Sequence, residues 1–459
     1  MASLVLRAKY SRKRKFCVGG SAFLLAVVGT SFLGCGGGEP ASGLSWTYGG
    51  SERPVLSWPV LDEAGNIFVL VGAEATRQSI ETSFDVQAVE LVSLDSSGAL
   101  RWSYSVFGPA TVTEAVTRPS VHEGDVWVYF RDRILRISGA GELRWILHDV
   151  PSKVMGSGWP LDWTDSSRTA LDAAGNFYFM PFVTAGPGMQ RQELWAISSD
   201  GRIRWRGNPT LEGGNGGEDD LPPPDQTEAP LVAPDGTILT GCTTCVAGRA
   251  GLARSDPNTG VASLLYSDEI GGGYVTFANV LWDGASVWYE VTLDEPVHWQ
   301  TRLDGSTTQQ SHALTLVTNS GPVWIEDERH SSGDFVMHWG SEVARLDMAS
   351  IVTETDARTR VRPLAATEPA AVLVQVLTSK ESSLALFDVK GNALWHTAGG
   401  SDGITPVPII YQGSIVYIDN VSRRLISESV PVASIAQGPC PMLGGTAQNT
   451  RNAQSRIAQ

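Results

Sequence analysis

The stretch Ser93–Tyr104, SLDSSGALRWSY, carries the pattern on which the fold prediction depends. Its residues read as a strand, a tight turn centred on Asp95–Gly98 and a second strand that carries Trp102. The pattern returns three times with a glycine four residues before a tryptophan, as RISGAGELRW (Arg136–Trp145), AISSDGRIRW (Ala196–Trp205) and LFDVKGNALW (Leu386–Trp395). Self-similarity of this kind predicts a repeat architecture.

Length and composition support the same interpretation. The chain has 459 residues, which is too long for one ordinary hydrophobic core. Glycine (49 residues) and proline (25 residues) are abundant, and short β-rich runs are separated by Gly, Asp and Asn. No segment in the middle of the chain reads as a linker. We therefore expect an all-β protein built from one repeated unit.

Eight similar units fit between Leu44 and Gln459, each with four strands. The second strand of each unit is expected to be apolar on both faces, because neighbouring sheets cover it from both sides. These strands are expected at Ile67–Gly72, Val126–Phe130, Phe177–Phe182, Thr237–Gly241, Val287–Val291, Val323–Asp327, Ala371–Val376 and Ile415–Asp419. The hairpin that ends in tryptophan supplies the third and fourth strands.

Several copies of the hairpin are eroded. Leu264 and Gln309 stand where the tryptophan is expected, and Ala344–Val352 keeps only the Leu-Asp core of the unit. The extra length of the longer units is expected in loops such as Glu74–Asp85 and Glu212–Asp225. Because the fifth and sixth units are the most eroded, seven units are the alternative to eight.

The two ends of the repeat complement each other. The last unit has a third strand near Arg424–Glu428 but no fourth, whereas Leu44–Gly50 is a lone strand of the fourth-strand type that contains Trp46. A closed ring in which the N-terminal strand completes the last sheet accounts for both ends and leaves no open sheet edge. We therefore expect an eight-bladed β-propeller of four-stranded antiparallel blades.

The N-terminal segment is expected to be an export signal. Six basic residues between Arg7 and Lys15 precede the apolar run Phe16–Gly34, which ends at Cys35. The sequence Phe32–Cys35 looks like a bacterial lipobox, in which the cysteine is lipidated and becomes the first residue. An uncleaved membrane helix and ordinary secretion are the alternatives.

This interpretation divides the chain into three parts. Residues 1–34 are the signal peptide, residues 35–43 a flexible glycine-rich tether, and residues 44–459 the propeller. The first 34 residues hold six basic and no acidic side chains, so their removal takes the net charge from −15 to −21. A surface that acidic repels phosphate backbones, and nucleic acid is not expected as a partner.

The repeated hairpin resembles the pyrroloquinoline-quinone-type (PQQ-like) β-propeller repeat family. The family's unit is close to A-x-D-x-x-x-G-x-x-x-W, and here the spacing from Asp to Gly is one residue shorter. The C-terminal segment Gly438–Ala453, GPCPMLGGTAQNTRNA, is similar to the tail of exported bacterial members, with Cys440 in place of a tryptophan. The resemblance implies that the tryptophans pack between blades with each indole N–H bonded to a neighbouring backbone. That role would fall to Trp46, Trp102, Trp145, Trp205 and Trp395.

The resemblance covers two functional branches. One contains quinoprotein dehydrogenases, which hold PQQ and Ca²⁺ over the ring axis, and the other contains non-catalytic envelope lipoproteins. The sequence has no adjacent cysteine pair, no haem motif and no acidic group that reads as a Ca²⁺ cage with a base. We therefore expect no catalytic residue, cofactor or metal site. The expected role is binding or scaffolding among envelope proteins, in the outer membrane or at its periplasmic face.

Three other features carry weaker functional hypotheses. Cys242 and Cys245 form a CTTC pair, read as a disulfide or as two free thiols. The loop Gly213–Asp225 holds four acidic residues that would bind Ca²⁺ or, as in most such runs, simply be solvated. His330 and His338 flank a turn; a third metal ligand is not evident, so they are expected to be surface or packing residues.

Ten of the 15 tryptophans lie outside the repeated motif. Among them are Trp58, Trp163, Trp282, Trp288, Trp299, Trp324 and Trp339. Most are expected to pack between blades. Trp163 and Trp299 are placed on rim loops, where an indole would stack on a sugar or anchor a protein partner. Ligand or glycan binding by such rim aromatics is the alternative function.

Overall fold

The computed structural model describes most of the chain after residue 44. The described residues are 45–77, 83–113, 118–151, 169–186, 189–207, 230–246, 249–267, 276–283, 285–292, 296–310, 316–327, 334–352, 359–380, 382–397, 408–419 and 421–435. All of them belong to one compact unit, residues 40–459. Within these ranges, no helix is long and apolar enough to cross a membrane. The signal segment and Cys35 lie outside the described residues.

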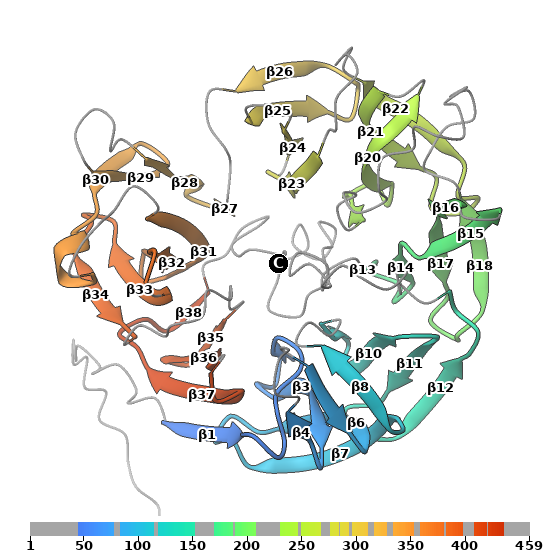
Figure 1. Ribbon diagram of the computed structural model, residues 1–459. Coiled ribbons are helices and arrows are strands. Elements are labelled where there is room, and N and C mark those ends of the chain that lie inside the picture. The colour runs from blue at the N-terminus through green and yellow to red at the C-terminus, as the bar shows by residue number, and fades with distance from the viewer. Residues whose placement is uncertain are drawn as a thin grey trace, which may run out of the picture. The chain divides into compact units, whose positions relative to one another are not determined.

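Six separate four-stranded antiparallel sheets form the first six blades (Figure 1). Blade 1 contains β2 (Val60–Leu61), β3 (Ile67–Ala73), β6 (Ala88–Leu94) and β7 (Leu100–Phe107). Blade 2 contains β9 (Ser120–His122), β10 (Asp125–Phe130), β11 (Arg133–Ile137) and β12 (Leu143–Leu147). Blade 3 contains β13 (Thr169–Leu171), β14 (Phe177–Phe179), β17 (Leu194–Ile197) and β18 (Ile203–Gly207).

The next three blades follow the same order. Blade 4 contains β19 (Leu231–Val232), β20 (Ile238–Val246), β21 (Arg249–Ser255) and β22 (Ala262–Ser267). Blade 5 contains β23 (Thr276–Trp282), β24 (Ser286–Thr292), β25 (Pro296–Arg302) and β26 (Thr307–Gln310). Blade 6 contains β27 (Leu316–Thr318), β28 (Gly321–Asp327), β29 (Phe335–Trp339) and β30 (Glu342–Arg345).

The last two blades belong to one nine-stranded sheet. Blade 7 contains β31 (Arg360–Glu368), β32 (Ala371–Leu377), β33 (Ser382–Asp388) and β34 (Ala393–His396). Blade 8 contains β35 (Ile409–Tyr411), β36 (Ser414–Asp419), β37 (Arg424–Ser429) and the N-terminal β1 (Trp46–Gly49). The short β38 (Ser434–Ile435) pairs with both β31 and β35 and so joins the two blades.

Ring closure takes place at blade 8. Strand β1 pairs antiparallel with β37, with Trp46 opposite Ser427. The backbone N–H of Val55 then donates to the carbonyl of Arg423 across 3.0 Å, which ties the start of blade 1 to blade 8. The eight-bladed propeller and its closure by the N-terminal strand are confirmed, and the seven-bladed alternative is wrong.

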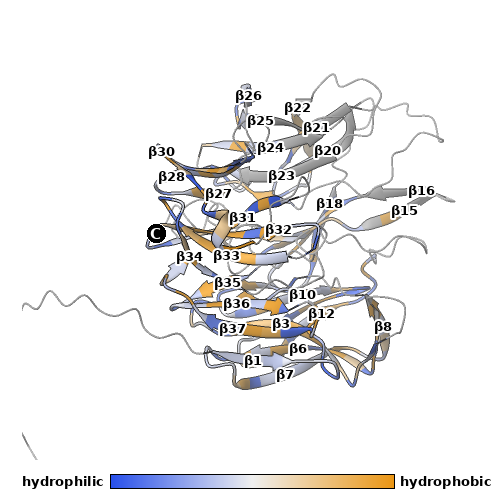
Figure 2. Cartoon of the chain, turned by 60° about the vertical axis from the view of Figure 1, so that its left-hand side comes forward, coloured by the Kyte–Doolittle hydropathy of each residue, from blue (hydrophilic) through white to orange (hydrophobic). Residues whose placement is uncertain are grey.

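The apolar second strands stack the blades on one another. In β3, Phe68 and Leu70 pack into a cluster shared with blade 2, whereas Ile67, Val69 and Val71 pack into a cluster shared with blade 8. Successive side chains of a strand point to opposite faces of its sheet, so a continuous apolar run can fill both interfaces. Figure 2 shows hydrophobic residues along the strands of the neighbouring blades.

Three sequence expectations need correction. Phe177–Phe182 is not one strand: β14 ends at Phe179, before Pro181, because a proline cannot donate to the ladder. The expected loop Glu74–Asp85 contains two short strands, described below. Ala344–Val352 is not the hairpin of blade 6, since β30 ends at Arg345 and a turn of 3-10 helix, η2 (Met348–Ser350), follows. Leu346, Met348 and Val352 are instead buried in the core between blades 6 and 7.

The antiparallel strands give the ring two faces of different construction. Turns from first to second strands and from third to fourth strands lie on one face, which we call the turn face. Connections from second to third strands and from blade to blade lie on the other, which we call the loop face. Described turn-face connections are short, such as Asp62–Asn66 and Asp95–Ala99, each closed by backbone hydrogen bonds.

Two added elements lie beside blades 1 and 3 (Figure 1), and their positions between second and third strands or between blades put them on the loop face. A small sheet beside blade 1 consists of β4 (Thr76–Arg77), β5 (Ser83–Val86) and β8 (Ala110–Thr113), and a hairpin beside blade 3 consists of β15 (Phe182–Gly186) and β16 (Met189–Gln192). The small sheet is anchored by Phe84, Val86 and Val112, which are buried in the core of blades 1 and 2. Departures from the repeat therefore concentrate on one face.

Candidate functional site

The motif tryptophans form joints between successive blades on the turn face. In four of the five, the indole N–H donates to a backbone carbonyl in the third-to-fourth turn of the next blade. The bonds run from Trp46 to Ser96 (3.1 Å), from Trp102 to Gly139 (2.9 Å), from Trp145 to Ser199 (2.9 Å) and from Trp205 to Pro257 (2.9 Å). The same kind of hydrogen bond therefore occurs at four consecutive blade junctions.

The glycine of the motif completes the joint. Gly141 has φ +86°, a conformation that disfavours side chains, and a Cβ there would lie 2.8 Å from the ring of Trp102. Trp395 is half-buried against the core shared by blades 7 and 8. Within the described residues its indole makes no hydrogen bond, because the fourth strand of blade 8 is β1 and no third-to-fourth turn lies there to accept one.

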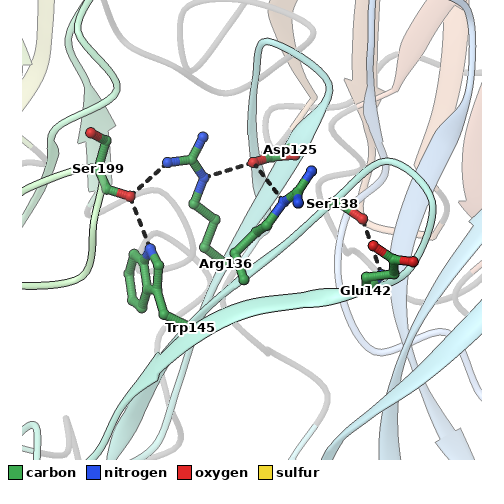
Figure 3. Close-up of polar contacts among 7 residues, drawn as sticks. Asp125, Arg136, Ser138, Glu142, Trp145 and Ser199 are labelled. Carbon is green, nitrogen blue, oxygen red and sulfur yellow. Dashed lines mark hydrogen bonds and ion pairs between the residues drawn. The ribbon is translucent and has the colours of Figure 1, made fainter.

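The junction of blades 2 and 3 shows how fully these joints are satisfied (Figure 3). Arg136 donates from Nε to Asp125 Oδ2 (2.8 Å) and from Nη1 to the carbonyl of Ser199 (2.6 Å). The same carbonyl accepts the indole N–H of Trp145, and Arg144 also approaches Asp125. These polar groups are bonded to one another across the two blades. The junction therefore holds the ring together and is not a candidate binding site.

The loop face holds a different group of side chains, at the junction of blades 1 and 2. We call Phe107, Phe130, Arg131, Asp132 and Arg133 the arginine–phenylalanine cluster. The guanidinium of Arg131 lies over Phe107 and Phe130, 5.1 and 5.8 Å from the ring centroids, and that of Arg133 lies 4.5 Å from the centroid of Phe107. The two rings pack edge to face at 5.5 Å. Cation–π contacts of this geometry hold the guanidinium groups in place.

The two arginines of the cluster differ in their charge partners. Arg133 donates from Nε to Asp132 Oδ1 (2.9 Å), and this hydrogen bond holds the pKa of the Asp132 carboxyl below its ordinary value. Arg131 donates from Nη2 to the carbonyl of Thr111 (2.7 Å). Arg131 is exposed, and no carboxylate of the described residues pairs with it.

A second guanidinium group, that of Arg118, is buried at the start of blade 2. Arg118, just before β9, is 2% exposed, and its Nε and Nη2 donate to the carbonyl of Pro59 at 3.3 and 3.2 Å. Burial lowers the pKa of Arg118 to about 9, so the group stays protonated at neutral pH. No carboxylate of the described residues pairs with it. Arg118 and Arg131 are thus two guanidinium groups at the loop-face ends of blades 1 and 2 without a carboxylate partner among the described residues.

Several site residues expected from the sequence lie outside the described residues. These are Cys35, Cys440, Trp163, His330 and the acidic loop Gly213–Asp225. Cys242 and Cys245 lie in β20, and the structure describes only their backbone, so their disulfide stays a prediction. His338 stacks on Trp324 (4.5 Å between ring centroids) and contacts Glu326 at 3.2 Å. Among the described side chains, no group of three or more His, Cys, Asp or Glu could hold a metal ion.

The tryptophans outside the motif are mostly structural. Trp282 and Trp339 are buried in interblade cores, and Trp58 packs against the cores on both sides of blade 8. Trp288 donates to Asp283 Oδ2 at 2.5 Å. Trp299 is not on a rim loop as expected: it lies within β25, opposite Tyr289 and Gln309. The alternating apolar residues around it are those of a strand.

The arginine–phenylalanine cluster was not predicted from the sequence. Its one local signal is the two-residue turn Arg131–Asp132, which joins Phe130 to Arg133 where such turns usually carry Gly or Asn. The approach of Phe107 and Thr111 depends on the packing of blade 1 against blade 2. Sequence spacing alone does not reveal it.

Comparisons with known proteins find similar folds and no related sequence. No family model and no curated protein matches the sequence. The chain is similar to Sqt1 from Saccharomyces cerevisiae, with 12% identity, 85% of this chain and 100% of that chain covered, and a TM-score of 0.45. It is also similar to the propeller of Dos1 (8% identity, 84% and 94% covered, TM-score 0.44) and to the β-propeller domain of Cps50 (Swd1) from Myceliophteria thermophila (10%, 84% and 100%, 0.43). At these values the likeness supports no functional conclusion.

Proposed function

We propose that this chain is a non-catalytic binding scaffold of the bacterial cell envelope that holds a protein partner on its loop face. The difference between the two faces supports the proposal. The turn face is built from short closed turns and interblade joints, whereas the loop face carries the added strands and the exposed Arg131. In a repeat protein, binding residues are expected where the repeat is broken on a rigid support.

The sequence supports a membrane tether for this scaffold. The basic region, the apolar run and the lipobox-like Phe32–Cys35 precede the propeller, and the hairpin motif resembles that of exported PQQ-like lipoproteins. We propose Cys35 as the lipidated residue, with no bound PQQ or Ca²⁺. Labelling cells with a palmitate analogue tests this: Cys35→Ala should abolish labelling and membrane fractionation, and unchanged labelling would refute the tether.

Site-specific photocrosslinking in the native cells tests the binding face. A crosslinking amino acid is introduced at Thr76 or Thr111, which are exposed on the loop face, and in matched controls at Ser97 or Lys390, which are exposed on the turn face. The expected result is a crosslink to one protein from the loop-face positions alone. Equal crosslinking from both faces, or crosslinks from the turn face alone, would contradict the proposal.

A further inference from the structure

The backbone of Arg131 is unusual for its residue type. Its φ is +52°, in the left-handed region that disfavours side chains other than those of Asn and Asp, and it opens the turn between β10 and β11. Glycine or asparagine would adopt this conformation at lower cost. An arginine there carries a conformational cost without contributing to the ladder, and such strain is often found at binding sites.

The side chain of Arg131 is held rather than free. One N–H of Nη2 is used by the carbonyl of Thr111 at 2.7 Å, and the plane of the group is supported by Phe107 and Phe130. A guanidinium has five N–H donors, so most remain available at the exposed end. A side chain already fixed in this way loses less entropy when it binds than a free surface arginine does.

The charges around Arg131 select the kind of ligand. The carboxylate of Asp132 is engaged by Arg133, and that of Asp85 accepts the hydroxyl of Thr111 at 2.6 Å. Arg131 is therefore the member of the cluster that lacks an acidic partner among the described residues. The planar fork of a guanidinium matches a carboxylate in geometry and charge.

We propose that the arginine–phenylalanine cluster is a preorganised anchor for a carboxylate side chain in an acidic segment of the protein partner. Arg131 binds the carboxylate, while the half-buried ring of Phe107 holds the guanidinium in place. Anchors that combine arginine and aromatic groups commonly dominate protein interfaces. This inference rests on the proposed function, because it names the chemistry by which a protein partner is recognised.

A peptide titration with the purified full chain tests the anchor. The probe is a fluorescently labelled oligoglutamate peptide, with an oligoglutamine peptide of equal length as its uncharged control, and anisotropy reports binding. The native chain should bind oligoglutamate and not oligoglutamine. Arg131→Gly should weaken binding by about tenfold or more, the usual effect of losing a charge-assisted hydrogen-bonded pair.

Two variants make the result specific. Arg131→Lys keeps the charge but not the planar fork of the guanidinium. Its affinity for oligoglutamate should therefore lie between those of the native chain and Arg131→Gly. Arg202→Ala removes an arginine on the turn face whose side chain is 85% exposed, and it should leave binding unchanged. Glycine suits the φ of Arg131, so Arg131→Gly should fold, and thermal unfolding measured in parallel verifies this.

Three outcomes would overturn the anchor. Arg131→Gly could bind oligoglutamate as tightly as the native chain, or Arg202→Ala could lose as much affinity, which would indicate non-specific attraction. Inorganic phosphate could displace the peptide better than acetate does at equal ionic strength, which would indicate a phosphate site. The titration needs no native partner, so a negative titration with positive crosslinking rejects the anchor alone. A positive titration with negative crosslinking rejects the protein partner and leaves Arg131 as a carboxylate site of another role.

Discussion

At the scale of single residues, the tryptophan–glycine joint explains why the repeat keeps two residue types at a fixed spacing. The indole reaches the next blade only if the facing turn has no side chain, because a Cβ at Gly98 would lie 2.4 Å from the ring of Trp46. The N–H then satisfies a carbonyl of the facing turn, as Trp102 does at the part-buried carbonyl of Gly139. A buried or half-buried carbonyl that loses its donor costs free energy, so neither partner can change alone without loss.

We expect Trp102→Phe to destabilise the chain by about 1 kcal/mol, chiefly through the lost hydrogen bond to Gly139. The loss stays modest because Arg101 Nη2 also donates to that carbonyl, at 3.2 Å. Trp395→Phe is the matched control, since its indole makes no hydrogen bond to a described residue. Urea unfolding measures both variants, and equal losses would show that the indole bond contributes nothing beyond packing.

At the scale of the element, aspartates organise the turn face. In the turn after β6, Oδ1 of Asp95 accepts the backbone N–H groups of Ser97 (2.9 Å) and Ala99 (3.0 Å). Asp256 does the same for Asn258 and Thr259 in the turn after β21. The carboxylate in each case replaces hydrogen bonds that the tight backbone cannot make to itself. The hairpin turns therefore depend on ionised aspartate.

These aspartates predict an acid-sensitive fold. The Ser97 side chain and the turn N–H groups hold the pKa of Asp95 below its ordinary value, and the N–H groups of Thr259 and Asn258 do so for Asp256. A carboxyl whose pKa is lower in the folded state stabilises the fold above its unfolded-state pKa of roughly 4. That stabilisation is lost as the pH falls through the folded-state pKa.

Unfolding in urea across this pH range measures the effect. The native chain should lose stability progressively below about pH 4. Asp95→Asn keeps the acceptor oxygen but cannot ionise, so it should be less stable at neutral pH and should lose less on acidification. If the native chain and Asp95→Asn lose the same amount of stability, the folded-state pKa of Asp95 is not lowered.

The elements themselves divide into those the sequence predicts and those it does not. The second strands, such as Ile67–Gly72, were predicted because they are apolar on both faces, a local property. Ala344–Val352 was misread because Leu-Asp also occurs at the start of η2, where burial between blades decides the conformation. The arginine–phenylalanine cluster was missed because Phe107 and Arg131 meet only when two blades pack.

At the scale of the whole molecule, the ring is closed by strands from opposite ends of the propeller. Strand β1 completes blade 8 against β37, and β38 joins blades 7 and 8. Trp46 then extends the joint across the closure, from β1 to the turn of blade 1. The arginine–phenylalanine cluster lies on the neighbouring blades 1 and 2, so its geometry depends on how these two blades pack.

Deleting residues 44–49 should therefore open the ring at one known place. The outer edge of β37 loses its partner and becomes a free sheet edge, which is prone to pair with another chain. We expect a lower and broader thermal transition with concentration-dependent association, seen by size-exclusion chromatography. Deleting residues 36–43, which leaves only Cys35 of the predicted tether 35–43, is the matched control and should change neither property. Strand β1 is held by backbone pairing along Trp46–Gly49. A synthetic peptide of sequence LSWTYGG, added to the truncated chain, should therefore restore the monomer. The same peptide with proline at the position of Thr47 should not, because proline has no backbone N–H to donate. If the truncated chain stays monomeric with an unchanged transition, closure by β1 does not stabilise the ring.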